Sequence, residues 1–166
     1  MAMTGHEADD RRAAYDRIVA LEYACAACLD DDRLEAWPDF FVEDCVYNIT
    51  TRENVEDGFP LGIFQCHNRA QLRDRVKILR NAAVFSLRYY RHLISNIRIL
   101  AHDDPYYDIE AHYAVYATDV VDGTTEIFST GKYLSKVIAS NDGFHFKERV
   151  VIADTASIPK NLSVPL

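Results

Sequence analysis

The stretch from Tyr89 to Leu100 constrains the fold more than any other part of the chain, because it alternates like a long β-strand without a solvent face. One set of alternate residues is Tyr89, Arg91, Leu93, Ser95, Ile97 and Ile99, and the other is Tyr90, His92, Ile94, Asn96, Arg98 and Leu100. Both sets are partly apolar, so we expect both faces of this sheet to be covered. If the chain's own helices supply only one covering layer, a partner has to supply the other.

Length and charge exclude several kinds of protein. A chain of 166 residues is expected to form one domain, residues 1–166, whose single core buries roughly 70% of the surface that the unfolded chain exposes. Its 26 acidic residues against 18 basic residues give a net charge of -8. Because this charge repels phosphates and anionic lipids, we expect no nucleic-acid partner and no membrane partner.

Residues 1–12 are polar and lack the apolar centre of a signal peptide, so we expect a mobile N-terminus and a cytoplasmic protein. No stretch of the sequence is apolar for long enough to span a membrane. In the reducing cytoplasm all four cysteines are expected to remain thiols. They are Cys25, Cys28, Cys45 and Cys66.

The first part of the chain predicts helices. Apolar residues recur at helical spacing over residues 9–29, which indicates one amphipathic helix. The acidic run at residues 30–32 is expected to cap a second, shorter helix over residues 33–41. Asn68 is expected to cap a third helix. Its buried side consists of Leu72, Val76 and Leu79.

Strands follow the helices. A short strand is expected over residues 45–50, before a long loop over residues 51–65. Turn residues such as Asp122-Gly123 then separate long alternating runs, so these strands are expected to pair antiparallel. The four long strands are predicted over residues 87–101, 108–119, 124–139 and 144–155. Helices before a bent meander indicate an α+β fold, in which a curved antiparallel sheet packs on the N-terminal helices.

The sequence offers little for a cofactor or a metal. Cys25 and Cys28 have the spacing of a redox or metal-ligand pair, but no second Cys or His pair completes a zinc site. Both cysteines fall on the apolar side of the first helix, so we expect them to be core residues. The sequence also contains no glycine-rich phosphate loop. We therefore expect this chain to hold no cofactor and no metal.

One group of polar residues on the predicted strands could support chemistry, because a His beside a carboxylate can act as a general base. The group is His92, Glu110, His112, Tyr116 and Arg149. Such residues also suit ion pairs and subunit contacts, which are enriched in aromatic residues and Arg. We therefore expect no catalytic residue, with His92, His112 and Glu110 as fallback candidates. The subunit-interface candidates are Tyr89, Arg91, His92, Asn96, Tyr116 and Arg149.

The end of the sequence is unusually apolar. Residues 158–166 carry one charged side chain, that of Lys160, whereas free termini are normally polar and disordered. We therefore expect the tail over residues 156–166 to pack on the sheet or on a neighbouring subunit.

Several short segments follow one another in a fixed order. They are Leu29-Asp30-Asp31-Asp32 with Trp37 and Phe41, Asp44-Cys45-Val46-Tyr47, Leu72 with Arg75-Val76 and Leu79, Arg91-His92-Leu93-Ile94-Ser95-Asn96-Ile97, Gly131-Lys132-Tyr133, and residues 147–154. From about Ala14 onward this order resembles the small (beta) subunit of bacterial aromatic-ring-hydroxylating dioxygenases. The loop segments at residues 51–54 and 60–63, and Val164-Pro165-Leu166, are most similar to subunits of enzymes acting on aromatic acids such as terephthalate, salicylate, anthranilate or halobenzoate.

The resemblance implies a cone-like fold shared with ketosteroid isomerase, scytalone dehydratase and nuclear transport factor two. It implies a homotrimer of this chain that joins three large catalytic alpha subunits in a hetero-hexamer. The alpha subunit is expected to carry a Rieske 2Fe-2S cluster and a mononuclear Fe(II), and to use O2 and electrons from NADH. This chain is then a non-catalytic subunit for assembly and stability.

Two other functions remain open on the residues. A stand-alone dehydratase or isomerase of the same fold would use His92 or His112 as its base. A small-ligand binding protein would instead contain a sizeable apolar pocket without an acid–base pair.

Overall fold

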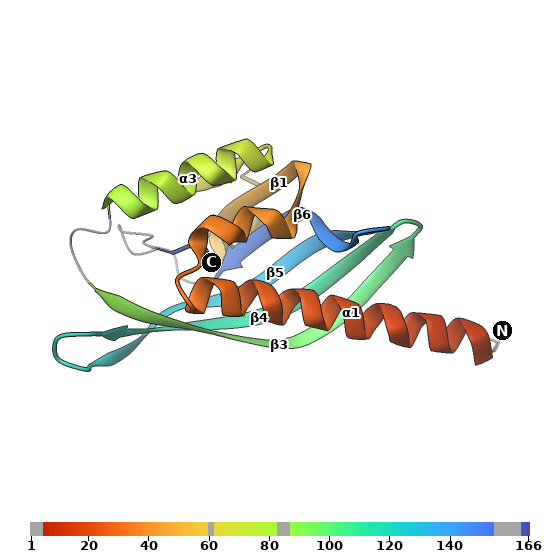
Figure 1. The fold of residues 1–166 in the computed structure, drawn as a ribbon, viewed down its shortest axis with the longest axis horizontal. Coiled ribbons are helices and arrows are strands. Elements are labelled where there is room, and N and C mark those ends of the chain that lie inside the picture. The colour runs from red at the N-terminus through yellow and green to blue at the C-terminus, as the bar shows by residue number, and fades with distance from the viewer. Residues whose placement is uncertain (1–4, 60–61, 83–86, 155–163) are drawn as a thin grey trace.

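A computed structural model describes residues 5–59, 62–82, 87–154 and 164–166, which form one curved sheet with helices across its concave face (Figure 1). The helices are α1 (Gly5–Asp30), the 3-10 helix η1 (Leu34–Phe40), α2 (Arg52–Glu56) and α3 (Arg69–Ala82). The strands are β1 (Phe41–Thr51), β2 (Phe64–Cys66), β3 (Arg88–Asp103), β4 (Tyr106–Asp119), β5 (Thr125–Ser140) and β6 (Gly143–Ala153). The α+β class and the curved sheet are confirmed.

The sheet has the strand order β2-β1-β6-β5-β4-β3. Strands β3 to β6 form the predicted antiparallel meander, and Gly123 takes the positive φ of 74° that its hairpin turn requires. Strand β1, however, pairs parallel with β6, so that Tyr47 lies beside Arg149. The sheet is therefore mixed rather than purely antiparallel. Strands β1 and β6 can pair parallel because they are far apart in the chain and no hairpin joins them.

Helix α1 crosses the concave face of the sheet (Figure 1). Its inner side buries Ile18, Leu21, Cys25 and Cys28, which confirms the predicted amphipathic helix. The helix begins at Gly5 instead of residue 9, since polar residues continue its first turns. The mobility expected of residues 1–12 stays a prediction, and residues 1–4 lie outside the described part of the chain.

The alternation in β3 changes phase at Asn96. Tyr90, His92 and Ile94 face the helices before this point, whereas Ile97 and Ile99 face them after it. Asn96 has a positive φ of 52°, and the pairing with β4 shifts between Ser95 and Arg98, which is a β-bulge. The strict alternation predicted from Tyr89 to Leu100 is therefore wrong beyond Ser95, because the bulge inserts one extra residue.

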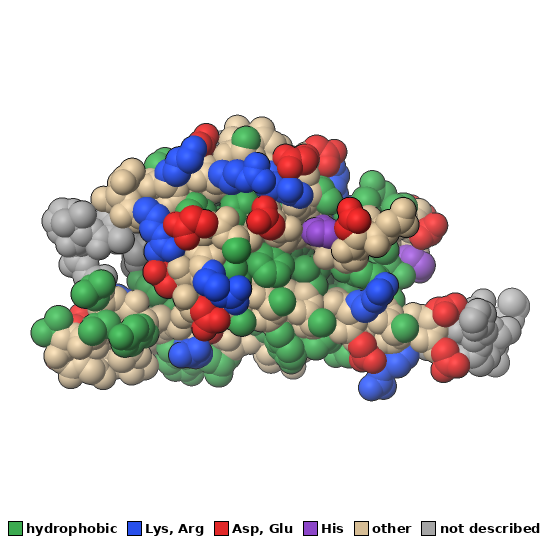
Figure 2. Space-filling model, in the orientation of Figure 1, with side chains coloured by type: hydrophobic (Ala, Val, Ile, Leu, Met, Phe, Trp, Pro, Cys, Tyr) green, Lys and Arg blue, Asp and Glu red, His purple; other side chains and the backbone are tan. Residues whose placement is uncertain are grey.

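The acidic run after α1 has a different role from the predicted one. Arg33 occupies the N-cap of η1 and makes no capping hydrogen bond through its side chain within the described residues. Asp32 instead pairs with Arg80 of α3 at 2.7 Å, as does Glu35 at 2.7 Å. The hydrogen bond from Arg80 lowers the pKa of Glu35 to about 2. Charged side chains consequently cover the α3 and η1 side of the molecule in Figure 2.

Two short elements lie within the predicted loop over residues 51–65. Helix α2 begins directly after Thr51, whose hydroxyl accepts a hydrogen bond from the backbone N–H of Asn54. Strand β2 pairs antiparallel with β1, which places Cys66 opposite Tyr47. The cap predicted for the third helix is confirmed, since Asn68 Oδ1 accepts from the N–H of Gln71 at 2.9 Å.

The described part of the chain contains no helix with the length and apolar character needed to cross a membrane.

Replacing Asn96 by Val should lower the free energy of unfolding by about 1–2 kcal/mol, because a β-branched side chain is strained at positive φ. Urea denaturation of the purified chain measures this difference. Asn96→Gly is the matched control, since it keeps the conformation available, and it should lie within about 1 kcal/mol of the wild type. Equal losses in the two variants would show that strain at this bulge is not the cause.

Candidate functional site

The five polar residues selected from the sequence do not form one site. His92 and Arg149 lie on the concave face, where both are buried. Glu110 lies on the convex face beside His112, whose Nε2 is 3.6 Å from the Glu110 carboxylate. The Tyr116 side chain lies on the same face of β4 as those of Glu110 and His112. The sheet therefore separates the two histidines, and the predicted constellation is divided into two groups.

The first buried group joins the end of α1 to β3. Both carboxylate oxygens of Asp30 accept from the backbone N–H of His92 at 3.0 Å, and Oδ1 lies 2.6 Å from His92 Nδ1. The His92 side chain is 1% exposed and that of Asp30 is 7% exposed. Asp30 therefore fixes both the backbone and the ring of His92, and this residue was missed in the sequence because it was interpreted as a helix cap.

The other ring nitrogen of His92 points at the end of the chain. His92 Nε2 lies 3.3 Å from the carbonyl oxygen of Pro165. Both of its ring nitrogens thus face oxygen atoms. Residues 155–163 of the predicted tail lie outside the described residues, whereas Val164 and Leu166 are buried.

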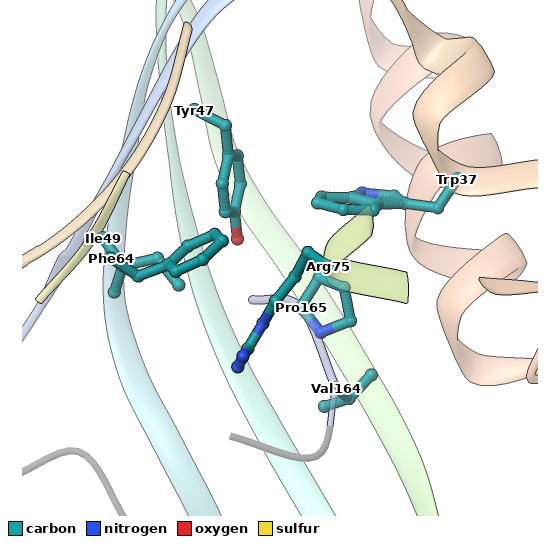
Figure 3. A pocket seen from close by; sticks show the side chains of 7 residues that line it. All are labelled: Trp37, Tyr47, Ile49, Phe64, Arg75, Val164 and Pro165. Carbon is teal, nitrogen blue, oxygen red and sulfur yellow. The ribbon is translucent and has the colours of Figure 1, made fainter. Parts of the chain in front are cut away.

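Tyr47 binds the same C-terminal segment. Its hydroxyl donates to the carbonyl oxygen of Leu166 at 2.8 Å and accepts from the N–H of Leu166 at 3.2 Å. Burial raises the pKa of Tyr47 far above its usual value, so the hydroxyl keeps its proton. Figure 3 shows Tyr47, Trp37 and Pro165 around a small cavity of about 10 Å³, which is room for about one water molecule.

The second buried group is an ion pair at the centre of the cone. Arg149 donates through its guanidinium to Glu22 Oε1 and through Nε to Ser135 Oγ at 3.1 Å. The guanidinium carbon lies 3.8 Å from the ring centre of Phe146 and 4.4 Å from that of Tyr133. Burial alone would lower the pKa of Arg149, but the charge of Glu22 raises it overall.

The Glu22–Arg149 pair connects α1 to β6, and its two side chains are buried in the interior of the cone. Glu22 Oε2 has no hydrogen-bond partner among the described residues. Glu22 among the apolar residues of the first helix is the sequence signal for this pair, and it was missed. Arg149, predicted as a subunit-interface candidate, has its side chain buried inside the chain.

The group on the convex face is a charge network around Glu110. Arg98 and Lys132 both donate to its carboxylate, the latter at 3.4 Å, and the hydrogen bond from Arg98 lowers the pKa of Glu110. Asn96 Nδ2 lies 3.0 Å from Nδ1 of His112. These contacts join β3, β4 and β5 across the face, as expected of a structural network.

Large apolar side chains are also exposed on this face of the sheet. On β3 and β5 they are Tyr89, Leu93, Leu100 and Ile127, which are between 49% and 66% exposed. The Arg91 side chain is 67% exposed. The convex face thus has the partly apolar character that the sequence indicated, and helices of the chain cover the concave face. Of the six interface candidates, His92 and Arg149 are buried inside the chain. The other four stay predictions.

The cysteines behave as core residues. All four are buried free thiols, as predicted for Cys25 and Cys28. Burial raises the pKa of Cys25 to about 12, so this thiol keeps its proton at neutral pH. Within the described ranges, no group of three or more His, Cys, Asp or Glu side chains is placed to hold a metal ion.

Comparisons with known proteins agree with this architecture. Residues 25–160 match the family described as ring hydroxylating beta subunit. The chain is 41% identical over 138 residues to the small subunit of anthranilate 1,2-dioxygenase from Burkholderia cepacia, which covers 83% of this chain and 85% of that subunit.

Solved structures show the same relationship. The beta subunit assigned to an aromatic-ring-hydroxylating dioxygenase of Novosphingobium aromaticivorans superposes with a TM-score of 0.86 at 37% identity, covering 94% of this chain and 99% of that one. A protein assigned as a scytalone dehydratase from the same organism has a TM-score of 0.73 at 16% identity, covering 95% of each chain, and shows a shared fold alone. The cone-like fold is confirmed, and this chain belongs to the ring-hydroxylating beta subunit family.

Replacing Asp30 by Asn should lower the free energy of unfolding by about 1–3 kcal/mol, because it weakens buried charge-assisted hydrogen bonds to His92. Asp31→Asn is the matched control. Asp31 is 58% exposed in its ion pair with Arg33, so the change should stay within about 0.5 kcal/mol. Urea denaturation compares the two, and similar losses would contradict the structural role of Asp30.

Replacing Glu22 by Leu should lower the free energy of unfolding by about 3–5 kcal/mol, because the buried charge of Arg149 is left without its partner. The double variant Glu22→Leu/Arg149→Leu should recover most of this loss, since neither charge is then buried. Thermal and urea unfolding of both variants and of Arg149→Leu completes the double-mutant cycle. Additive losses would mean that the two residues do not depend on each other.

Proposed function

We propose that this chain is the non-catalytic small subunit of a terminal oxygenase that hydroxylates an aromatic acid. Its membership of the ring-hydroxylating beta subunit family carries the proposal. The partner is a large catalytic alpha subunit, and the role of this chain is the assembly and stability of the complex. The buried charges support this role, because Glu22, Asp30 and Arg149 are all engaged in holding the fold together.

The alpha subunit is proposed to hold the Rieske 2Fe-2S cluster and the mononuclear Fe(II). In the complete enzyme, O2 supplies two hydroxyl oxygens to the aromatic ring, and a reductase delivers the two electrons of NADH. Among the described residues, no group of three or more His, Cys, Asp or Glu side chains is placed to hold either iron centre. We place the complex in the cytoplasm.

An aromatic ring with a carboxylate is the substrate class that we favour. The relative with 41% identity is named for anthranilate, which is such a ring. That identity extends over 83% of this chain, so the similarity is not confined to one structural segment. Because the substrate would bind in the alpha subunit, activity of the complex has to identify the acid.

The convex face of the sheet is the proposed surface for subunit contacts. Tyr89 and Leu93 expose apolar side chains there, next to the charged Arg91. Aromatic residues and Arg are enriched at the centres of protein interfaces, and charge networks such as that of Glu110 can align a partner. We propose that this face contributes to a homotrimer of the chain within a hetero-hexamer.

A stand-alone dehydratase or isomerase gains less support. Asp30 and His92 have the geometry of an orienting carboxylate and a base, but Nε2 of His92 faces the carbonyl of Pro165. The other fallback pair, Glu110 and His112, lies on the convex face in a network with Arg98. The proposed small-subunit role needs neither pair to react.

The purified chain should form a trimer by light scattering, and it should co-purify with a large subunit encoded beside it.

Leu93→Asp should shift the trimer to monomer, because a charge would enter the proposed contact surface. Ile78→Asp is the matched control, since Ile78 is similarly exposed but lies on α3. Circular dichroism checks that both variants are folded.

Two outcomes separate the parts of this proposal. If the Leu93→Asp variant is still a trimer, β3 is not part of the contact surface, and the family assignment is unaffected. A monomeric wild-type chain that fails to co-purify with the large subunit and turns over a substrate by itself would sink the assembly role.

A further inference from the structure

A ring of three identical chains needs two different surfaces on each chain, because each contact around a three-fold axis joins one surface to another that differs from it. The convex side of β3 supplies one of the two. Tyr89 and Leu93 expose apolar side chains there, and the side chain of Arg91 between them is 67% exposed. The second surface has to complement this β3 surface, defined as Tyr89, Arg91 and Leu93, in both polarity and charge.

The β3 surface lies on a face where positive charge is in excess. Arg98 and Lys132 share the single carboxylate of Glu110. Arg91 approaches Asp30 only to 3.8 Å, and that carboxylate already accepts hydrogen bonds from the β3 backbone. The Arg91 guanidinium therefore has donors left for an acidic group of a partner.

The matching surface lies at the opposite edge of the sheet. In the strand order β3 is the last strand at one edge, whereas β1 and β2 form the other edge, and α2 follows directly after β1. Val55 of α2 is 49% exposed and Phe59 is 61% exposed. The N–H of Phe59 donates to the carbonyl oxygen of Asn54 at 2.8 Å, so the turn after α2 keeps Phe59 close to the helix. Two large apolar side chains are therefore exposed within one short turn.

Acidic residues flank these apolar residues in the sequence and are exposed like them. They are Glu53, Glu56 and Asp57. The basic residue of α2, Arg52, pairs with Asp154 at 3.0 Å, and no ion pair joins the three acids to another residue in the described part of the chain. This α2 surface, residues 53–59, is therefore apolar and acidic, where the β3 surface is apolar and basic.

We propose that the α2 surface of one copy docks on the β3 surface of the next copy, and that this contact repeats around the trimer. The inference rests on the proposed homotrimer and adds the surface that completes its ring. A second copy is the occupant because it brings both exposed apolar side chains and three acids that can pair with Arg91. Each chain has a net charge of -8, so copies repel one another unless such opposite charges meet.

Phe59→Lys tests the α2 surface, because it replaces an apolar contact by a charge of the same sign as Arg91. The subunit concentration at which half of the trimer has dissociated should rise at least about ten-fold, measured by light scattering over a dilution series. Ile78→Lys is the matched control, since Ile78 is 56% exposed on α3, and it should leave dissociation unchanged. Circular dichroism checks that both variants are folded.

Arg91→Glu tests the pairing of opposite charges. A carboxylate at this position would face the acids of α2, so dissociation should shift in the same direction by at least about five-fold. Arg73→Glu on α3 makes the same change of net charge at a side chain that is 49% exposed, and it should have no effect. Equal shifts in the two variants would be an effect of net charge and would contradict the pairing.

Cross-linking identifies the surfaces that meet and changes them little. Val55→Cys and Ser95→Cys keep the size of each exposed side chain nearly unchanged, and Ser95 follows Leu93 on the same face of β3. In the double variant, a short bis-maleimide should join neighbouring copies into covalent dimers and trimers on a denaturing gel. Each single variant should stay monomeric on the gel. The native cysteines are buried, and burial raises the pKa of Cys25 to about 12, so they should not react.

All of these measurements use the assembly that the wild-type chain forms, either the trimer alone or the complex with its large subunit. A trimer that keeps its stability in Phe59→Lys, or a double-cysteine variant without linked products, would overturn the α2 contact and leave the proposed function intact. Equal linking in the single variants would overturn the contact as well, because like surfaces would then meet. A wild-type chain that neither trimerises nor binds a large subunit would instead overturn the proposed function, and the contact with it.

Discussion

The fold depends on two buried carboxylates of α1 that pair with the sheet. Glu22 binds Arg149 of β6, and Asp30 binds His92 of β3. The two carboxylates are eight residues apart, which is about two helical turns or roughly 12 Å along the helix. Because an unpaired buried charge is strongly destabilising, a helix shifted along its axis or rotated about it would lose both pairs. These contacts therefore define how α1 lies on the concave face.

The two faces of the sheet also differ in how they use their polar and aromatic residues. The concave face uses its charges and aromatic rings internally, so its polar residues hold helices, strands and the Val164–Leu166 segment. The convex face has exposed apolar residues such as Tyr89 and Leu93, and the charge network of Glu110 lies on the same face. The proposed role of the convex face in subunit contacts rests on this difference.

Periodicity and turn residues were enough to predict the α+β class, the first and third helices and the four long strands. These features depend on neighbours within a few residues, as with the cap by Asn68 or the turn at Gly123. The parallel pairing of β1 with β6 was missed, because nothing near β1 in the sequence specifies a strand about a hundred residues away. The bulge at Asn96 was missed because alternation alone cannot show where one extra residue is inserted.

The family could be recognised along the chain, because a fixed order of short segments is visible in the sequence alone. The partner of each polar residue could not be recognised in this way and depends on the fold. Glu22 and Arg149 are 127 positions apart, and Tyr47 and Leu166 are 119 apart. Contacts at such separations depend on the packing of whole elements, and packing also decided that His92 faces the helices whereas Glu110 faces outward.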